Sequence, residues 1–266
     1  MCILALYLQA FEDFPLVIAA NRDEFYSRPS APPQVLLENP RVFCGKDLLA
    51  GGTWFGVNEH GLLAGILNRR SNRTMDPSAV RSRGLLCLDI LRARDPEEAR
   101  EFIKREKASA YPPFNLLFAN PEEAYVAYNL EDEIPCVKLD RGVHVFGNIS
   151  IYGSPSEKMD HAYRLFSRAR SQSADPTAGD AASNRGSAAR NPAALVRRFQ
   201  EILRDHSFGK ESDNPKDAIC VHTSDYGTVS STIVFHEAER KRFDYYHAPG
   251  PPCRSAYEKL PALGVL

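Results

Sequence analysis

The sequence lacks the cysteine and histidine spacings that are typical of metal sites. Its six cysteines stand at positions 2, 44, 87, 136, 220 and 253, with no C-x-x-C pair among them. The seven histidines fall at no recognisable ligand spacing, so the sequence predicts no metal ligands and no required cofactor. A chain of 266 residues can build its core without disulfide staples. We therefore expect reduced thiols and a cytoplasmic location.

The sequence also lacks an excess of charge of either sign and any long apolar run. Lysine and arginine number 33 against 34 aspartate and glutamate, which gives a formal net charge of -1. This balance favours neither nucleic acid nor an anionic membrane as a partner. No stretch approaches the ~18 continuous apolar residues of a membrane span, and no basic segment precedes an apolar run at the N-terminus. We expect a soluble, unexported protein, and the sequence leaves its oligomeric state open.

Hydrophobic patterns predict strands and helices in blocks rather than in alternation. The predicted strands cover residues 2–8, 15–20, 42–45, 51–58, 61–68, 114–119, 124–129, 135–139, 143–148, 218–223, 230–236 and 243–247. The predicted helices cover residues 84–94, 156–170 and two segments that begin near residues 95 and 192. Such blocks indicate an α+β fold with antiparallel sheets. We expect one domain over 1–266, with a mobile insertion at about 171–191, which has no large apolar side chain.

The first 24 residues have the pattern of an antiparallel hairpin. Two apolar segments, 2–8 and 15–20, flank a short polar connection. In a hairpin centred near residue 11 or 12, residue 2 lies opposite roughly residue 21 or 22. Cys2 and the run from Asn21 to Glu24 are therefore expected at the same end of the hairpin. This arrangement places a thiol beside charged side chains.

Cys2 stands where N-terminal chemistry can use it. Removal of Met1 is generally permitted before a small side chain, so Cys2 would then carry a thiol and a free amine. The α-amino group has a reference pKa of about 7.7–8.0 and the thiol one of about 8.5, so the amine can serve as the base of the thiol. The alternative is that Cys2 is a small buried residue at the start of a strand.

Proline and glycine mark two further segments as irregular. Pro29, Pro32 and Pro33 argue against helix or central strand, so we expect an ordered loop or a surface arm there. The run from Tyr226 to Thr228 predicts a turn that leads into the strand at residue 230, because Gly227 gives the backbone extra freedom.

Several motifs together carry a resemblance to a known family. They are Met1-Cys2-Ile3, the AANRDEFYSRP run from Ala19 to Pro29, the GGTWFG run from Gly51 to Gly56, Asn68, Phe114-Asn115, Asn148 and Tyr226-Gly227-Thr228. On these residues, and over nearly its whole length, the chain resembles the NRDE family, or transport and Golgi organisation protein 2 family. That family is similar to N-terminal nucleophile hydrolases such as choloylglycine hydrolases and penicillin V acylases. The resemblance implies a four-layer αββα sandwich of two antiparallel sheets.

The resemblance also implies roles for single residues. Cys2 matches the nucleophile, and Asp23 matches the carboxylate that holds the N-terminal amine. Asn68 and Asn148 match the amides that donate to the oxyanion. The alternative readings are a loop salt bridge for Asp23 and simple turn formation for the two asparagines. The chain departs from the hydrolase pattern at residue 20, where Ala20 stands in place of an arginine.

Four more residues are expected to bind the substrate. They are Asn21, Arg22, Trp54 and Tyr226. The alternative for Trp54 is a place in the core or in a pocket wall.

These features predict a cysteine amidohydrolase or acyltransferase that acts on linear amides. The alternative is a protein that keeps the fold but binds or moves haem or an acyl lipid without turnover, with haem as a candidate ligand. A third reading, an interaction module of the secretory pathway, has no motif in its favour. The expected partner in the first two cases is a small amide, acyl or haem-like molecule.

Overall fold

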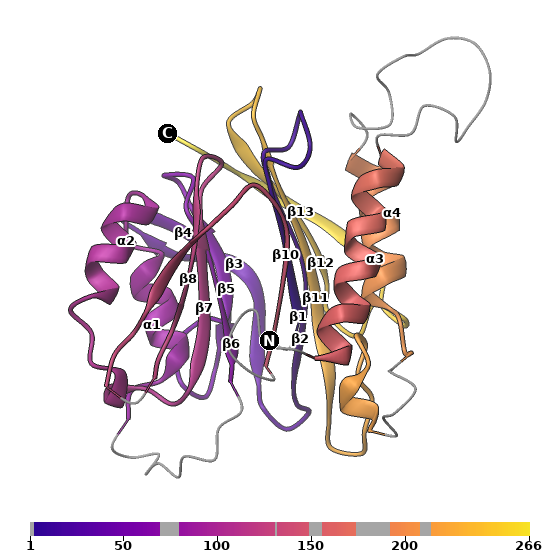
Figure 1. Ribbon diagram of the computed structural model, residues 1–266, viewed down its shortest axis with the longest axis horizontal. Helices are drawn as coiled ribbons and strands as arrows, with labels where there is room; N and C mark the ends of the chain where they lie inside the picture. Colours follow the sequence, from indigo (N-terminus) through magenta and orange to yellow (C-terminus); the bar gives the residue numbers. More distant parts are fainter. Residues whose placement is uncertain (1–2, 70–79, 131, 149–155, 174–191, 208–213) are drawn as a thin grey trace.

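The computed structural model describes residues 3–69, 80–130, 132–148, 156–173, 192–207 and 214–266. Two antiparallel sheets lie face to face, and helices cover the outer face of each (Figure 1). The predicted αββα sandwich of two antiparallel sheets is therefore confirmed. No helix in the described part of the chain is both long and apolar enough to cross a bilayer.

The two sheets are made from different parts of the chain. Among the described residues, six strands form sheet A, in the order β10 (Gly142–Gly147), β1 (Ile3–Leu8), β2 (Leu16–Phe25), β11 (Tyr226–Glu237), β12 (Arg242–Ala248) and β13 (Glu258–Gly264). Seven further described strands form sheet B, in the order β3 (Ser30–Glu38), β4 (Arg41–Asp47), β5 (Phe55–Asn58), β6 (Leu63–Asn68), β7 (Phe114–Ala119), β8 (Ala124–Tyr128) and β9 (Cys136–Leu139). The first and the last described strands, β1 and β13, thus both belong to sheet A, where three strands separate them.

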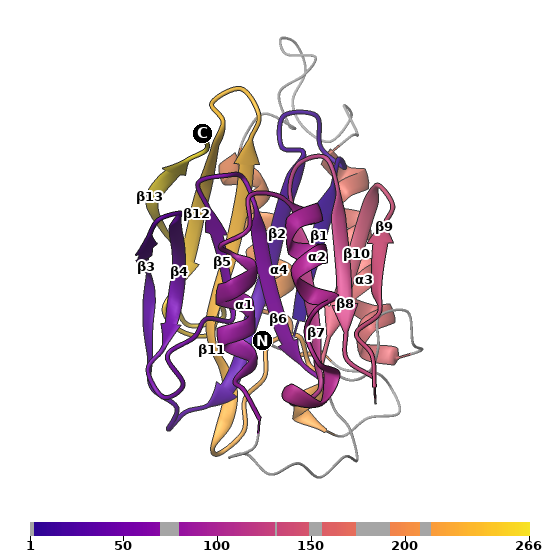
Figure 2. The ribbon, with the colours of Figure 1, turned by 90° about the vertical axis from the view of Figure 1, so that its left-hand side faces the viewer.

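Each sheet has its own helical cover. Helices α1 (Arg83–Ile90) and α2 (Pro96–Ile103) pack on sheet B, whereas α3 (Glu157–Ser173) and α4 (Pro192–Leu203) pack on sheet A (Figure 2). Helix α2 begins as the sequence predicts, because the Asp95 side chain caps the amide of Glu98 at 2.8 Å and proline occupies the first helical position.

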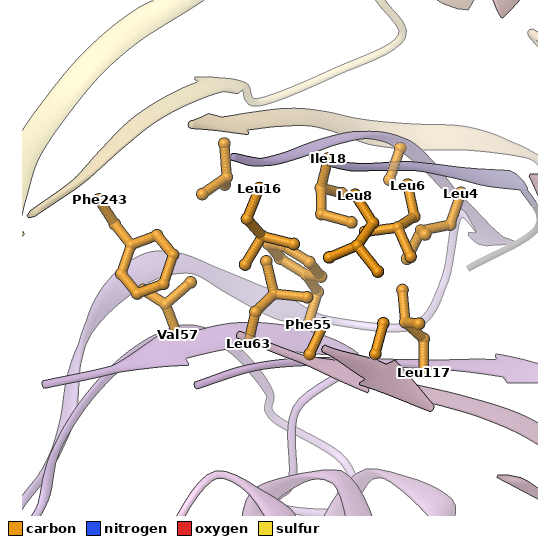
Figure 3. Packing of buried hydrophobic residues seen from close by; sticks show 14 of the residues in the cluster. Leu4, Leu6, Leu8, Leu16, Ile18, Phe55, Val57, Leu63, Leu117 and Phe243 are labelled. Atoms are coloured by element: carbon orange, nitrogen blue, oxygen red, sulfur yellow. The ribbon is translucent and has the colours of Figure 1, made fainter. Parts of the chain in front are cut away.

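Alternation along β1 explains why this strand is apolar throughout. Leu4, Leu6 and Leu8 point between the sheets, where they meet residues such as Phe55 and Leu117 of sheet B (Figure 3). The intervening side chains of β1 belong instead to the layer under α3 and α4. A strand buried on both faces needs apolar residues at every position. The same alternation continues along β2 toward the candidate site.

The proline-rich segment forms a strand, which the sequence did not predict. Residues Ser30–Glu38 make up β3, with Pro32 and Pro33 inside it. The strand lies at the edge of sheet B and pairs only with β4, with register shifts beside the prolines. An edge strand tolerates proline because one side of its backbone needs no partner strand. The expectation of a loop or surface arm was therefore wrong. Strand β13, which contains Pro261, lies at the edge of sheet A and was not predicted from the sequence.

The predicted strand at 218–223 is also wrong. Residues 218–221 are buried but form no strand, and His222 makes an isolated bridge to Gly227. The expected turn at Tyr226–Thr228 is instead the first part of β11, paired with the end of β2. The apolar pattern of residues 218–221 reflects their burial and not a strand.

The predicted insertion at 171–191 overlaps the end of α3. Helix α3 continues to Ser173, so the first three residues of the predicted insertion are helical. The rest of the insertion lies outside the described residues.

Candidate functional site

The N-terminal hairpin has the predicted register. Ile3 lies opposite Asn21, and the pairing continues to Leu8 opposite Leu16. Cys2, the predicted nucleophile, lies outside the described residues. Along β2 the even-numbered residues face the space between the sheets, whereas the odd-numbered ones face the helices α3 and α4. Arg22 is thus directed to the interior between the sheets, and Asn21 and Asp23 to the helical side.

A cavity of about 710 Å³ opens where β2 faces the ends of β4 and β6. Its lining combines charged, aromatic and amide side chains from both sheets and from the start of α1. The lining residues are Arg22, Glu24, Phe25, Arg28, Asp47, Leu49, Ala50, Thr53, Trp54, Ile66, Asn68, Val80, Arg81, Ser82, Arg83, Gly84, Pro112 and Pro113. The volume lies within the usual range for small-molecule sites. Three of the predicted site residues, Arg22, Trp54 and Asn68, therefore meet in one cavity.

Arg22 and Trp54 form the centre of the lining. The Arg22 guanidinium lies 4.2 Å from the centre of the Trp54 ring, and its Nη1 donates to Ser30 Oγ at 3.3 Å. The Trp54 ring fits because it lies over Gly45, where a Cβ would come within 2.5 Å of two ring carbons. Burial lowers the pKa of Arg22, but an arginine side chain remains charged in proteins. The cavity thus contains a buried positive charge on an aromatic face.

A second arginine of the lining, Arg83, is the first residue of α1. Its Nη1 donates to the carbonyl of Pro113 at 3.0 Å. The helix start approaches closely because Gly52 has no side chain: a Cβ there would lie 2.2 Å from the carbonyl carbon of Gly84. Among the described residues, neither Arg22 nor Arg83 forms an ion pair with a carboxylate. The cavity therefore has two cations available for an anionic or carbonyl group.

The remaining arginines of the lining are already paired. Arg28 Nη2 lies 2.6 Å from Asp47 Oδ2, and Arg81 lies 2.5 Å from Asp89. Burial alone would raise the pKa of Asp47, but hydrogen bonds from Arg28 and from the amides of Leu49 and Ala50 outweigh it and lower the pKa. These two ion pairs engage Arg28 and Arg81, in contrast to Arg22 and Arg83.

Asn68 and Asn148, the two predicted oxyanion donors, differ in their placement. Asn68 ends β6 and exposes its side chain to the cavity. Asn148 directly follows β10 and is half-buried, but it is not among the lining residues described. Asn115 of β7 donates to the carbonyl of Gly147 at 3.1 Å and thereby ties the end of β10 to sheet B. Only Asn68 is therefore presented directly to a ligand in this cavity.

Besides Asn148, three predicted site residues lie away from the lining. Asn21 is fully buried and donates to the carbonyls of Leu203 and Ile219 at 2.8 and 2.9 Å, which fastens β2 to the end of α4. Asp23 is 1% exposed and accepts a hydrogen bond of 2.6 Å from the hydroxyl of Thr228. Tyr226 packs edge-on against Phe25 with ring centres 5.3 Å apart. The structure does not bring these three side chains into the cavity.

The other arginines of the cavity were not predicted from the sequence. Arg28 lies within the motif run that ends at Pro29, and its spacing from Glu24 was the available signal. Arg81 and Arg83 gave no comparable signal, because only the packing of the α1 start on sheet B brings them to Arg22.

Two solved structures share this architecture over nearly their whole length. One is a penicillin V acylase from Agrobacterium tumefaciens, with a TM-score of 0.52 and 13% identity, covering 100% of this chain and 99% of that one. The other is a Caenorhabditis elegans ortholog of N-acylethanolamine-hydrolyzing acid amidase, with a TM-score of 0.54 and 11% identity, covering 98% of this chain and 100% of that one. The protein thus has the fold of the N-terminal nucleophile hydrolases, as predicted.

Sequence comparison assigns the chain to a family. The family model described as Transport and Golgi organisation 2 matches residues 1–247. A Transport and Golgi organization protein 2 homolog from Bos taurus is 28% identical over 245 residues, which is 85% of this chain and 83% of the relative. The Mus musculus homolog is 27% identical over 248 residues, with the same two shares. The chain therefore belongs to the Transport and Golgi organisation 2 family.

Proposed function

We propose that this protein is a cysteine amidohydrolase or acyltransferase of the N-terminal nucleophile type, acting on a linear amide. The observation that carries the proposal is the register of the N-terminal hairpin. Ile3 pairs with Asn21, the neighbour of Arg22, and Arg22 lines the cavity. Cys2 immediately precedes Ile3 in the chain, and the proposal takes its thiol to enter the cavity beside Arg22.

The proposed reaction divides amide cleavage into two steps. After removal of Met1, the free amine of Cys2 takes the proton of the thiol, and the sulfur attacks the amide carbonyl carbon. The C–N bond breaks, the leaving amine takes up the proton, and a thioester remains on Cys2. Water then hydrolyses the thioester to the acid and restores the thiol; an acceptor amine in place of water would make the reaction an acyl transfer.

The residues of the cavity support this chemistry. The amide of Asn68 would donate to the developing oxyanion, and a donor in that role contributes about 3–4 kcal/mol. Arg22 and Arg83 would bind a carboxylate or another anionic group of the substrate. Asp23, whose side chain lies on the helical side of β2, would hold the protonated amine of Cys2, with Thr228 fixing the carboxylate. Asn148 would assist from the end of β10.

The test compares cysteine variants of the full-length protein. The wild type, Cys2→Ala, Cys2→Ser and the control Cys136→Ser are assayed on N-acyl amides with and without a carboxylate. We expect the intact mass to show that Met1 is removed, and an alkyne iodoacetamide to label Cys2 selectively. Cys2→Ala should lose hydrolysis, whereas the control Cys136→Ser should keep it. Hydrolysis that survives Cys2→Ala, or active protein that retains Met1, contradicts the mechanism.

A second candidate function is binding of haem or an acyl lipid without turnover. It is favoured by Arg22 and Arg83, which line the same cavity as Trp54 and form no ion pair with a carboxylate among the described residues, because guanidinium groups recognise carboxylates such as haem propionates. Trp54 is the only tryptophan of the chain, so its fluorescence reports on the cavity directly. Saturable quenching by haem or acyl-CoA that Arg22→Gln weakens at least about tenfold would support this reading, since one charged contact contributes about 1.5–3 kcal/mol. Equal quenching in Arg22→Gln and in the exposed control Arg240→Gln would overturn it.

We also propose a cytoplasmic location. The five described cysteines are free thiols, which supports a reducing compartment.

A further inference from the structure

Four side chains with metal-binding atoms gather at the end of sheet A, outside the candidate cavity. They are His206, just after α4, Cys220 and His222, between the short helical turn Pro215–Asp217 and β11, and Cys253, in the connection from β12 to β13. Their donor atoms all lie within 4.8 Å of one another. Sequence spacing did not reveal this set, because three separate segments contribute to it. The only local signal is the Cys-x-His pair at 220 and 222.

The distances within the cluster fit a single tetrahedral metal ion. Zinc bonds of about 2.3 Å to sulfur and about 2.0–2.1 Å to nitrogen put two sulfurs about 3.8 Å apart and a sulfur and a nitrogen about 3.6 Å apart. The sulfurs of Cys220 and Cys253 are 3.7 Å apart. His222 Nε2 lies 3.6 Å from the Cys220 sulfur and 3.2 Å from the Cys253 sulfur. Three of the four donors thus already stand at nearly the separations of a zinc site.

The backbone holds the ligands in place. His206 Nδ1 lies 3.2 Å from the carbonyl oxygen of Cys220, and as the donor in this hydrogen bond it leaves the lone pair on Nε2. The amide of Cys220 in turn donates to the carbonyl of Asp205 at 2.8 Å. The amide of Val221 donates to the hydroxyl of Thr228 at 2.9 Å. Such outer hydrogen bonds are typical of sites that orient histidine ligands.

A metal ion bound by the cluster would also account for the burial of residues 218–221, which form no strand. Cys220 is 1% exposed, and the neighbouring residues Ile219 and Val221 are equally buried. A cross-link to His206 and Cys253 would fix this segment between α4 and the β12–β13 connection. Ligands from three segments that are distant in sequence stabilise a fold most effectively, because each closes a long loop.

We propose that His206, Cys220, His222 and Cys253 bind one zinc ion as a structural site. Two sulfur and two nitrogen donors in a tetrahedral arrangement select zinc over magnesium or calcium. Four protein ligands leave no open coordination position, so the ion would not take part in catalysis. Through Val221 and Thr228, the site would stabilise the strand pair that carries Asp23.

The test measures metal in the untagged, full-length protein. Purified without chelator, it should contain about one zinc per chain, as a site with four protein ligands retains its ion. Zinc is counted by plasma mass spectrometry. After replacement by cobalt, the visible spectrum should show tetrahedral ligand-field bands and a thiolate charge-transfer band.

Variants localise the ion. We expect Cys220→Ser and Cys253→Ser each to lower cobalt affinity at least about tenfold, whereas Cys136→Ser on β9 leaves it unchanged. If either variant fails to fold by circular dichroism, the zinc content and cobalt spectrum of the wild type decide. Three results would each overturn the proposal. The first is full zinc content in both folded variants, and the second is a wild type with no metal and no cobalt charge-transfer band. The third is a Cys220–Cys253 disulfide in protein from a reducing cytosol. Cys2→Ala should keep its zinc, which separates this site from the proposed hydrolase.

Discussion

The Arg22 guanidinium of sheet A lies 4.2 Å from the centre of the Trp54 ring, which directly precedes β5 of sheet B. This contact joins the two sheets at the cavity, where their facing side chains are no longer purely apolar. It positions the buried cation and also gives the protein a single fluorescent group inside its candidate site.

The contact between Arg22 and Trp54 should be measurable as a coupling free energy. Double-mutant cycles of Arg22→Gln with Trp54→Leu are expected to give a coupling of about 0.5–2 kcal/mol in the free energy of unfolding, the range for a cation over an aromatic face. Urea denaturation followed by circular dichroism provides the measurement. The cycle of Trp54→Leu with Arg240→Gln, on an exposed turn, should be additive. A coupling no larger than that of the control would show that the contact does not persist in solution.

Asn68→Ala should separate catalysis from stability. If Asn68 donates to the oxyanion, its removal lowers kcat on amide substrates by about 10²–10³-fold. The free energy of unfolding should change by no more than about 0.5 kcal/mol, because the side chain is exposed at the end of β6. Steady-state kinetics and urea denaturation test the two parts. Asn120→Ala, in the β7–β8 turn, controls for loss of an amide elsewhere, and an equal loss of kcat there would rule out the specific role of Asn68.

Asn21→Ala should have the opposite profile. Its amide nitrogen donates to two buried carbonyls, those of Leu203 and Ile219, and removing it leaves both without that donor. We expect the free energy of unfolding to fall by about 2–4 kcal/mol, since an unsatisfied buried group costs about 1–3 kcal/mol. Thermal and chemical denaturation would measure this loss. A fully stable variant with reduced ligand affinity would instead return Asn21 to the substrate site.

The Arg28–Asp47 pair should make stability depend on pH in the acid range. The pKa of Asp47 is lowered in the folded state, so its contribution is complete above the unfolded pKa of about 3.9 and is lost as the pH falls through the folded pKa. Asp47→Asn is expected to lower the free energy of unfolding by about 1–2 kcal/mol at pH 7, the range for a partly exposed charged hydrogen bond.

This difference between the wild type and Asp47→Asn should shrink below about pH 4. Denaturation curves from pH 7 to pH 3 measure it. The exposed Glu239→Gln should show no such pH-dependent difference. If the difference in the free energy of unfolding between the wild type and Asp47→Asn stayed constant across the whole pH range, the charge of the Asp47 carboxylate would not be the source of the stabilisation.

The sequence predicted most of the fold, since its strong signals are local. The register of Ile3 with Asn21 followed from two apolar runs and a short turn. Strand β3 was missed because proline is excluded from central strands but tolerated in edge strands. The local sequence does not show which place a strand takes in its sheet. The stretch 218–223 was misread because a buried coil and a buried strand share one apolar pattern.

The candidate site was predictable only in part. Arg22, Trp54 and Asn68 were found because they lie in or beside recognisable motifs. Asn21 and Tyr226 belong to the same motifs, but Asn21 bonds to the helical side of sheet A and Tyr226 packs against Phe25 at the start of β11. Arg83 and the four residues of the proposed zinc site, which include Cys220, reach their neighbours only through tertiary packing.

The prolines of β3 and β13 have a consequence for behaviour at high concentration. These are the outermost strands of sheet B and sheet A, and both lie along the same flank of the sandwich (Figure 2). Pro32, Pro33 and Pro261 interrupt the row of amide donors that an added strand would need. That flank is thereby protected against strand-by-strand polymerisation into fibrils.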